Sequence, residues 1–399
     1  MPARSGHTLV ISKALCGLKS SGKRWWERCS TILTDKGFVP SLAEDDIWMR
    51  QRSDHYEYIA RYVDDMPIVS HNPKSITDKL EKKYHLKLKG SAPITYHLGC
   101  DFFRDDEGIL CLSPKKYIER ATNTYCRIFG EQPKASNSSP LEGGDYPELD
   151  ATDLLDADGI KHYQSLIGIL QWLVTLGRLD IATAVMIMSS FRAAPRIGHL
   201  NRLKHIFGYI VKMKHATSRF RVTPPDHTQH PTEQYDWEKT FYGNAKEIIA
   251  NNCPKPMGPR VTLTTYIDAN LCHDMMSRKS VTGILHFMNK TAIHFNSKKQ
   301  PVVETAAYGS EYMAARIAVE EIMELRNSLR YLGVNIDGPA YMFGGNLTVV
   351  DSSSIPQSRL HKRHVLLSFH RVREAIAAKV LRFIHIPGAI NPADILSKH

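Results

Sequence analysis

Hydrophobic spacing in the first third of the chain predicts one helix and two hairpins. Apolar positions at helical intervals predict a helix over residues 20–37, which its first two serines are suited to cap. Strand-like runs at 56–62 and 68–70 flank Val63-Asp64-Asp65 and predict a β-hairpin with two carboxylates at its tip. A second hairpin is predicted over 101–111.

The middle of the chain predicts a helical region. A loop rich in Pro, Ser, Gly and Asp covers about residues 131–159, and three amphipathic helices follow it. The third helix carries basic residues on its polar face. These residues either follow a phosphate backbone or simply face solvent, and we favour the second interpretation. These basic residues are Arg202, Lys204, Lys212 and Lys214.

The pattern changes after residue 260. Residues 223–260 are rich in Pro, Asn, His and Thr and are interpreted as a linker with some local helix. The last part predicts strand, hairpin, helix, strand, helix, strand and a final helical turn, which is a mixed α/β domain. The expected ranges are 261–267, 280–296, 310–332, 341–350, 363–379, 380–386 and a turn from residue 391.

Length and charge narrow the class of protein. The 399 residues are 42% hydrophobic and 23% charged, which fits two or three folded domains. The net charge of +11 indicates either a polyanionic partner or merely a basic surface. The seven cysteines include no C-x-x-C pair, which argues against a disulfide framework or zinc ribbon. The N-terminus shows no signal peptide, and the longest apolar run is too short to span a bilayer, so no membrane association is expected.

Two groups of acids could carry chemistry. Adjacent Asp64 and Asp65 repel each other unless a cation lies between them, and polymerases hold two Mg²⁺ ions with such pairs, although an isolated pair is usually a polar turn. Asp268, Glu311 and Asp394 are placed at a strand end and at two helix starts. The alternative for these three is unrelated surface acids that stabilise helix N-termini.

The motifs around these acids resemble those of copia-type reverse transcriptases. The stretch 13–22, KALCGLKSSG, followed by Trp25 and Gly37-Phe38, is similar to the signature before the family's catalytic hairpin. The likeness continues in family order along nearly the whole chain, at Leu98-Gly99, at residues 116–118, 163–168 and 178–182. In the last part, YIDA, SKKQ, GSEY and NPADILSK resemble the motifs of the ribonuclease H that follows the polymerase.

This resemblance implies the Pol polyprotein of a copia-type LTR retrotransposon, with an α+β, mixed α/β multidomain fold. The implied domains are truncated reverse transcriptase fingers and palm (1–130), thumb and connection helices (131–222), a linker (223–260) and a ribonuclease H-like domain (261–399). The implied metal-binding and catalytic residues at two-metal sites for Mg²⁺ or Mn²⁺ are Asp64, Asp65, Asp268, Glu311 and Asp394. The implied nucleic-acid contacts are Lys19, Arg363, Arg371 and Arg373.

The implied partners are an RNA template, a DNA primer and their hybrid, and the oligomeric state stays open. The implied location is a cytoplasmic virus-like particle with a nuclear phase. Two other functions remain in competition: a non-catalytic nucleic-acid-binding remnant, and an integrase-like nuclease. The nuclease is disfavoured because integrases end their acid set with Glu, whereas the last acid here is Asp394.

The sequence departs from the family at several positions. A further palm Asp is expected upstream of residue 1, so we expect an incomplete polymerase site without activity. Gly345 stands where the family has a ribonuclease H Asp, and Asp351 lies too far along the chain to replace it. Pro67 removes a donor from the return strand of the hairpin, and Arg61 replaces a small apolar residue. These changes indicate a decaying copy or, for some of them, a sequencing or gene-model error.

Overall fold

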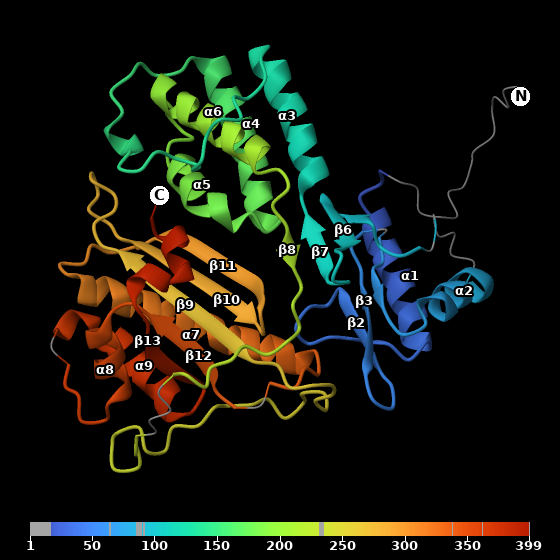
Figure 1. Ribbon diagram of the computed structural model, residues 1–399. Helices are drawn as coiled ribbons and strands as arrows, with labels where there is room; N and C mark the ends of the chain where they lie inside the picture. Colours follow the sequence, from blue (N-terminus) through green and yellow to red (C-terminus); the bar gives the residue numbers. More distant parts are fainter. Residues whose placement is uncertain are drawn as a thin grey trace, which may run out of the picture. The chain divides into compact units, whose positions relative to one another are not determined.

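The computed structural model describes residues 17–63, 65–84, 90, 92–230, 235–336, 338–360 and 362–398 (Figure 1). The chain divides into two compact units. The first comprises Met1–Ile94, Ala250–Pro259 and Asn327–Asn335; the second comprises Thr95–Ile249, Arg260–Arg326 and Ile336–His399. Among the helices within these described ranges, none is long and apolar enough to cross a membrane.

The first unit is an antiparallel sheet with two helices. Its strand order is β1-β2-β3-β4, with β1 (Val39–Pro40), β2 (Ile47–Gln51), β3 (Tyr56–Ala60) and β4 (Ile68–Val69). The helices are α1 (Ser21–Asp35), as predicted, and α2 (Pro73–Tyr84), which was not predicted. The residue before α1, Ser20, makes no side-chain capping bond, so Ser20 is not the cap. The core consists of Cys29, Ile32, Leu33, Phe38, Trp48, Ile59, Ile76 and Leu80.

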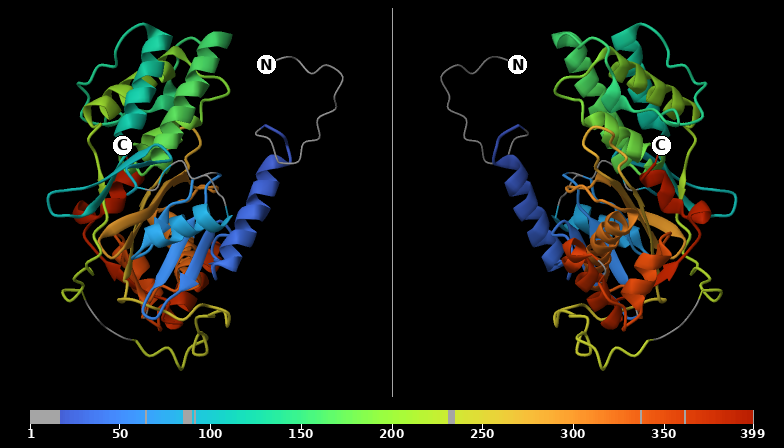
Figure 2. Two further views of the ribbon diagram at one scale, coloured as in Figure 1. Left: turned by 90° about the vertical axis from the view of Figure 1, so that its right-hand side faces the viewer. Right: turned by 90° about the vertical axis from the view of Figure 1, so that its left-hand side faces the viewer.

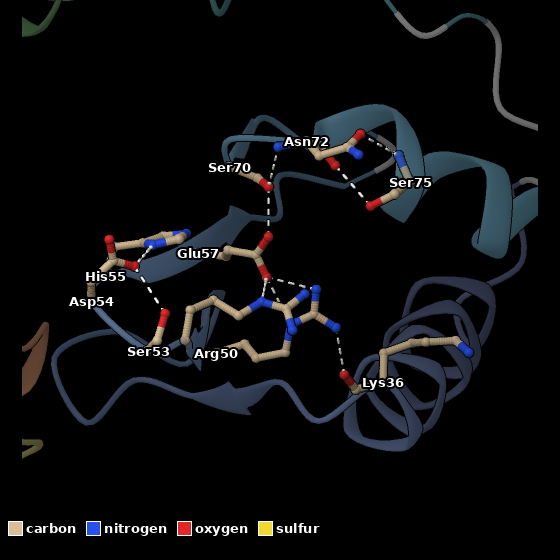
Figure 3. Close-up of polar contacts among 10 residues, drawn as sticks. Lys36, Arg50, Ser53, Asp54, His55, Glu57, Ser70, Asn72 and Ser75 are labelled. Atoms are coloured by element: carbon tan, nitrogen blue, oxygen red, sulfur yellow. Dashed lines mark hydrogen bonds and ion pairs between the residues drawn. The ribbon is translucent and has the colours of Figure 1, made fainter.

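A buried acid ties this sheet together. Glu57 of β3 is only 4% exposed, and its carboxylate accepts hydrogen bonds from Arg50, Arg52 and Ser70 (Figure 3). Arg50 also donates to the carbonyl oxygen of Lys36, which follows α1, at 2.8 Å. The network therefore joins β2, β3, the residue after β4 and the end of α1.

The second unit begins with a small sheet and a helical bundle. Its sheet has the order β5-β6-β7-β8, with β5 (Tyr96–His97), β6 (Cys100–Arg104), β7 (Leu110–Ser113) and β8 (Ser218–Arg219). The hairpin of β6 and β7 confirms the prediction over 101–111. The helices are α3 (Lys115–Phe129), α4 (Ala157–Thr175), α5 (Ala182–Ser189) and α6 (Ile197–Lys212), and the last three confirm the predicted helices. Their shared core includes Tyr125, Tyr163, Leu170, Met188 and Phe207.

Two basic residues of α6 are paired with acids within the protein. Arg202 forms ion pairs with Asp145 and Asp150 at 2.6 and 2.5 Å, and Lys204 forms one with Glu131 at 3.2 Å. The contacts of Arg202 and Lys204 therefore do not favour a helix face that follows a phosphate backbone.

The rest of the second unit is a five-stranded mixed sheet of the order β11-β10-β9-β12-β13. Strands β9, β10 and β11 are antiparallel, whereas β12 runs parallel to both β9 and β13, which is the expected ribonuclease H-like arrangement (Figures 1 and 2). The strands are β9 (Leu263–Asn270), β10 (Val281–Met288), β11 (Thr291–Lys299), β12 (Ala340–Gly344) and β13 (Leu381–His385). The helices are α7 (Ala307–Tyr331), whose residues from Asn327 onward belong to the first unit, α8 (Leu347–Ser354), α9 (Leu366–Ala377) and the C-terminal 3₁₀ helix η5 (Pro392–Leu396).

Three local features differ from the prediction for this region. Strand β9 continues past Asp268, and the helix with Glu311 begins at Ala307, so neither acid lies at the exact end of its element. The apolar run after residue 346 is α8, because the Asn346 side chain accepts from the backbone N–H of Val349 and begins a helix. The final helical turn with Asp394 is confirmed as η5, with Asn391 as its cap.

The segment interpreted as a linker packs on the mixed sheet and its helices. We call its described residues, 223–230 and 235–249, the strap. They form turns and loops rather than the expected local helix. His227 lies with its ring 4.3 Å from that of Tyr341, and Glu247 pairs with buried Arg326 of α7 at 2.7 Å. The strap is therefore held by specific contacts within the second unit.

Candidate active site

The predicted hairpin with the paired carboxylates forms between β3 and β4. Tyr62 and Asp65 exchange two backbone hydrogen bonds of 2.9 Å, and Val63 in the turn has a φ of 55°, a strained value for a β-branched residue. The indole N–H of Trp25 in α1 donates to the carbonyl oxygen of Val63 at 2.5 Å and supports the turn. Asp65 is exposed. Asp64 and the motif residues 13–16 lie outside the described residues.

Pro67 and Arg61, the two residues of this hairpin that differ from the family pattern, have clear structural consequences. Pro67 accepts a hydrogen bond from Ala60 at 3.0 Å but has no N–H to return, so one ladder bond is missing. Arg61 is 5% exposed, pairs with Asp46, and donates to the carbonyl oxygen of Trp26 at 3.2 Å. Arg61 therefore anchors the hairpin strand to α1 and to the loop before β2.

The three acids predicted for ribonuclease H come from β9, α7 and η5. Asp268 is 8% exposed and accepts a hydrogen bond from the hydroxyl of Ser397. The Lys398 ammonium forms an ion pair with Asp394 and lies 3.7 Å from Oδ2 of Asp268. Lys398 thus links two of the three acids.

The third acid, Glu311, is coupled to Asp268. Glu311 is 8% exposed, and the backbone N–H of Ala269, the residue after Asp268, acts to lower its pKa. Burial, together with the negative charge of Asp268, raises the pKa of Glu311 to about 8. Burial also raises the pKa of Asp268, against the opposing effect of the Ser397 hydrogen bond. Asp268 and Glu311 are both buried, and the negative charge of one disfavours ionisation of the other. A cation bound between them would stabilise the doubly ionised pair.

The donor chemistry suits a hard divalent cation, which prefers carboxylate oxygens. Within the described residues, however, no group of three or more His, Cys, Asp or Glu side chains is arranged to hold a metal ion. Lys398 supplies the positive charge between Asp268 and Asp394 in this structure. The metal role of Asp268, Glu311 and Asp394 therefore stays a prediction.

Position 345 lies beside these acids and has room for a side chain. Gly344 of β12 is the register partner of Ile267 in β9, so the next residues along the two parallel strands are Gly345 and Asp268. A Cβ added at Gly345 would meet only the Cα of Gly388, at 3.9 Å. Asp351 is exposed on α8. An aspartate is thus sterically acceptable at 345.

The residues predicted to contact nucleic acid differ in their environments. Lys19 and Arg363 are exposed, and Arg371 pairs with Glu374 at 3.0 Å. Arg373 is 3% exposed, and its guanidinium donates to three backbone carbonyl oxygens while it stacks on aromatic rings. The expectation that Arg373 contacts phosphates is corrected, because its side chain is buried and its two terminal nitrogens donate to carbonyl oxygens inside the protein.

The sequence analysis predicted no role for Ser397 and Lys398, which contact the acids. Both residues follow Asp394 closely in the ADILSK motif, and this proximity could have marked them as candidates. Their contacts with Asp268 depend on η5 packing beside β9, which no local pattern reveals.

Comparison with known proteins shows what the N-terminal part is similar to. Residues 2–128 match the family described as reverse transcriptase (RNA-dependent DNA polymerase). Almost the whole chain is related to retrotransposon Pol polyproteins. It is 24% identical over 397 residues to the retrovirus-related Pol polyprotein from transposon RE1 of Arabidopsis thaliana, which covers 99% of this chain and 24% of that protein.

A second relative extends this result. The Pol polyprotein from transposon TNT 1-94 of Nicotiana tabacum is 25% identical over 402 residues, which cover 97% of this chain and 27% of that protein. The chain therefore spans about a quarter of the length of these relatives.

Among solved structures, LC11-RNase H1 in complex with an RNA/DNA hybrid matches 33% of this chain and 89% of its own, with 17% identity and a TM-score of 0.27.

Proposed function

We propose that this chain is the reverse transcriptase and ribonuclease H part of a retrotransposon Pol polyprotein. By resemblance to the family, this part would copy an RNA template from a DNA primer and cut the RNA strand of the resulting hybrid. We propose that this copy is degenerate, with Gly345 in place of one of the acids. The observation that carries the ribonuclease H assignment is the acid cluster: Asp268 and Glu311 are buried and electrostatically coupled, and Lys398 joins Asp268 to Asp394. The proposed location is a virus-like particle in the cytoplasm, followed by a nuclear phase.

In the proposed ribonuclease H site, Asp268, Glu311 and Asp394 would hold Mg²⁺ or Mn²⁺. The metal ions would activate a water nucleophile and neutralise charge on the phosphate. The chain itself supplies part of the positioning, because the Ser397 hydroxyl orients Asp268. Asp64 and Asp65 of the hairpin are proposed to serve the polymerase site in the same way.

A second candidate function is a non-catalytic protein that binds nucleic acid. The observation that favours it is Gly345, which offers no ligand next to Asp268. With one acid missing, the remaining three bind a pair of divalent cations less well, because each carboxylate neutralises part of their charge and fixes their spacing. The net charge of +11 would still support binding to a hybrid.

The test compares hybrid cleavage by the full chain and its Gly345→Asp variant with Mg²⁺ or Mn²⁺. We expect salt-sensitive hybrid binding by both, little or no cleavage by the parent, and a gain of at least about tenfold on restoring the acid. Gly143→Asp is the matched control, because it adds the same charge at a loop glycine with open space.

Two further variants complete the assay. Asp268→Asn in the Gly345→Asp background should abolish the gain. Robust cleavage by the parent, or no gain in a folded Gly345→Asp protein, would show that Gly345 is not the lesion.

A further inference from the structure

Ser397 is a buried hydroxyl that joins two of the three acids. It is 0% exposed and directly follows η5. Its Oγ donates to Oδ2 of Asp268 and lies 3.2 Å from the backbone carbonyl oxygen of Asp394. Since a serine hydroxyl has one proton, the ionised carboxylate, the stronger acceptor, takes it.

The backbone that carries Ser397 is fixed independently of Asp268. The Asn391 side chain donates to the carbonyl oxygen of Ile267 at 2.7 Å, and Thr183 of α5 donates to that of Ile395 at 2.9 Å. Gly283 of β10 permits close packing, because a Cβ there would lie 2.7 Å from the carbonyl oxygen of Ala393. The hydroxyl is therefore held in place before it meets the carboxylate.

We propose that Ser397 is a positioning residue for the metal site, an inference that rests on the proposed ribonuclease H function. Its hydroxyl holds one oxygen of Asp268 and leaves the other for a cation. Through η5 it also fixes the separation of Asp268 from Asp394. No metal touches Ser397 itself.

Lys398 is a weaker candidate for this role. Its side chain is 49% exposed, so solvent screens its charge, and its ammonium must leave when a cation binds between the same two acids. The Ser397 hydroxyl is neutral and buried, and it keeps its hydrogen bond when a cation binds the opposite oxygen.

Removing the hydroxyl should loosen the Asp268 carboxylate. The terminal torsion of an aspartate has a broad energy well, so its orientation depends on hydrogen bonds. Residues that orient metal ligands typically affect metal affinity by about 10–100-fold. Ser397→Ala should therefore weaken cation binding by about tenfold or more.

The experiment measures Mn²⁺ affinity of the full chain by electron paramagnetic resonance. The background carries Gly345→Asp together with Asp64→Asn and Asp65→Asn, so that the proposed polymerase site does not contribute to the signal. Ser397→Ala should lose about tenfold or more in affinity, and Ser397→Thr, which keeps the hydroxyl, should stay within about twofold. Ser353→Ala is the matched control: Ser353 is also 0% exposed, but its hydroxyl donates to that of Tyr312. It should lower the thermal unfolding temperature as Ser397→Ala does, with Mn²⁺ affinity unchanged.

The outcomes separate this inference from the proposed function. If Asp268→Asn abolishes Mn²⁺ binding but Ser397→Ala does not weaken it, only the role of Ser397 is overturned. If the parent of this series binds no Mn²⁺, or if Asp268→Asn binds it normally, the proposed metal site and the role of Ser397 both fail. Should Ser397→Ala not fold, Ser397→Cys decides, since a thiol of similar size is a weak donor and should give an intermediate loss.

Discussion

Glu57 shows how a single buried carboxylate contributes to the first unit. Burial raises its pKa, but hydrogen bonds from Ser70, Arg50 and Arg52 outweigh that effect and lower the pKa to about 2 from 4.5. The ionised form is thus favoured in the folded state. Its contribution to stability is fully present above about pH 4.5 and is lost as the pH falls towards 2.

We expect Glu57→Gln to destabilise the first unit at pH 7 by about 2–3 kcal/mol, because it removes this charge-assisted network. The difference from the parent should shrink as the pH falls from 4.5 to 2. Thermal unfolding followed by tryptophan fluorescence measures it, since Trp25, Trp26 and Trp48 lie in this unit. Glu81→Gln, an exposed glutamate on α2, is the control. A difference that stays constant down to pH 2 would contradict the assignment.

Arg363 and Arg373 illustrate that residues of the same type and segment have different roles. Arg363 is exposed, whereas Arg373 is buried with carbonyl oxygens of Ser352, Ile355 and Pro356 as acceptors. We propose that Arg363 contacts the hybrid. Arg373 instead ties α9 to the chain around the end of α8.

Arg363→Ala should therefore weaken hybrid binding and reduce its salt dependence without changing the unfolding temperature. Arg373→Ala should lower the unfolding temperature, because it leaves buried carbonyl groups without donors. Fluorescence anisotropy with a labelled hybrid at several salt concentrations measures the first effect, and calorimetry the second. The assignment is wrong if Arg373→Ala is stable and loses hybrid binding.

At the scale of elements, the strap depends on a few aromatic and ionic contacts. The guanidinium of Arg373 lies 4.8 Å from the ring of Trp237 and 5.4 Å from that of Tyr242. Tyr242 also hydrogen-bonds His370 of α9 through its hydroxyl at 2.5 Å. In contrast, the ring of Phe241 is 91% exposed. The strap is thus attached through Trp237 and Tyr242, whereas the neighbouring Phe241 is exposed.

Trp237→Ala should release the strap, because it removes the ring that covers Arg373. We expect faster cleavage within residues 235–249 under limited proteolysis, identified by mass spectrometry. Phe241→Ala, a neighbouring aromatic deletion at an exposed position, should leave the cleavage rate unchanged. Equal rates for both variants would show that the strap is held elsewhere, for example at the pair of Glu247 and Arg326.

At the scale of the molecule, the mixed sheet and the helices before it form one compact unit. Ala182 of α5 packs with Leu285 of β10 and Leu396 of η5 in a shared apolar cluster. Thr183 donates a hydrogen bond to the carbonyl oxygen of Ile395 at 2.9 Å and accepts one from the Ser297 hydroxyl at 3.2 Å. The C-terminal acids therefore depend on packing from outside the last 139 residues, 261–399.

A fragment of residues 261–399 should consequently unfold at a lower temperature than one of residues 178–399. The shorter fragment loses the strap and α5, and it exposes the cluster of Ala182, Leu285 and Leu396. Circular dichroism melting of both fragments measures the difference. Equal unfolding temperatures would mean that the ribonuclease H-like part is self-sufficient.

Local patterns in the sequence determined most of the elements. The mostly apolar run over residues 281–288 and the helical spacing around residues 310–332 need only neighbouring side chains, so strand β10 and helix α7 followed from them. Asp268 and Glu311 could be predicted as site residues because each lies in a short motif, YIDA or GSEY, that resembles a family motif. Helix α8 was missed because its start depends on one side-chain bond from Asn346.

The tertiary structure alone decided how charged and polar side chains are used. Arg363 and Arg373 stand ten residues apart on one basic segment, yet one faces solvent and the other binds buried carbonyls, because only the second lies against α8 and the strap. Ser397 reaches Asp268 across 129 positions of sequence. Hydrophobic periodicity is a local property of the chain, whereas the partner of a buried polar group is set by which distant elements pack together.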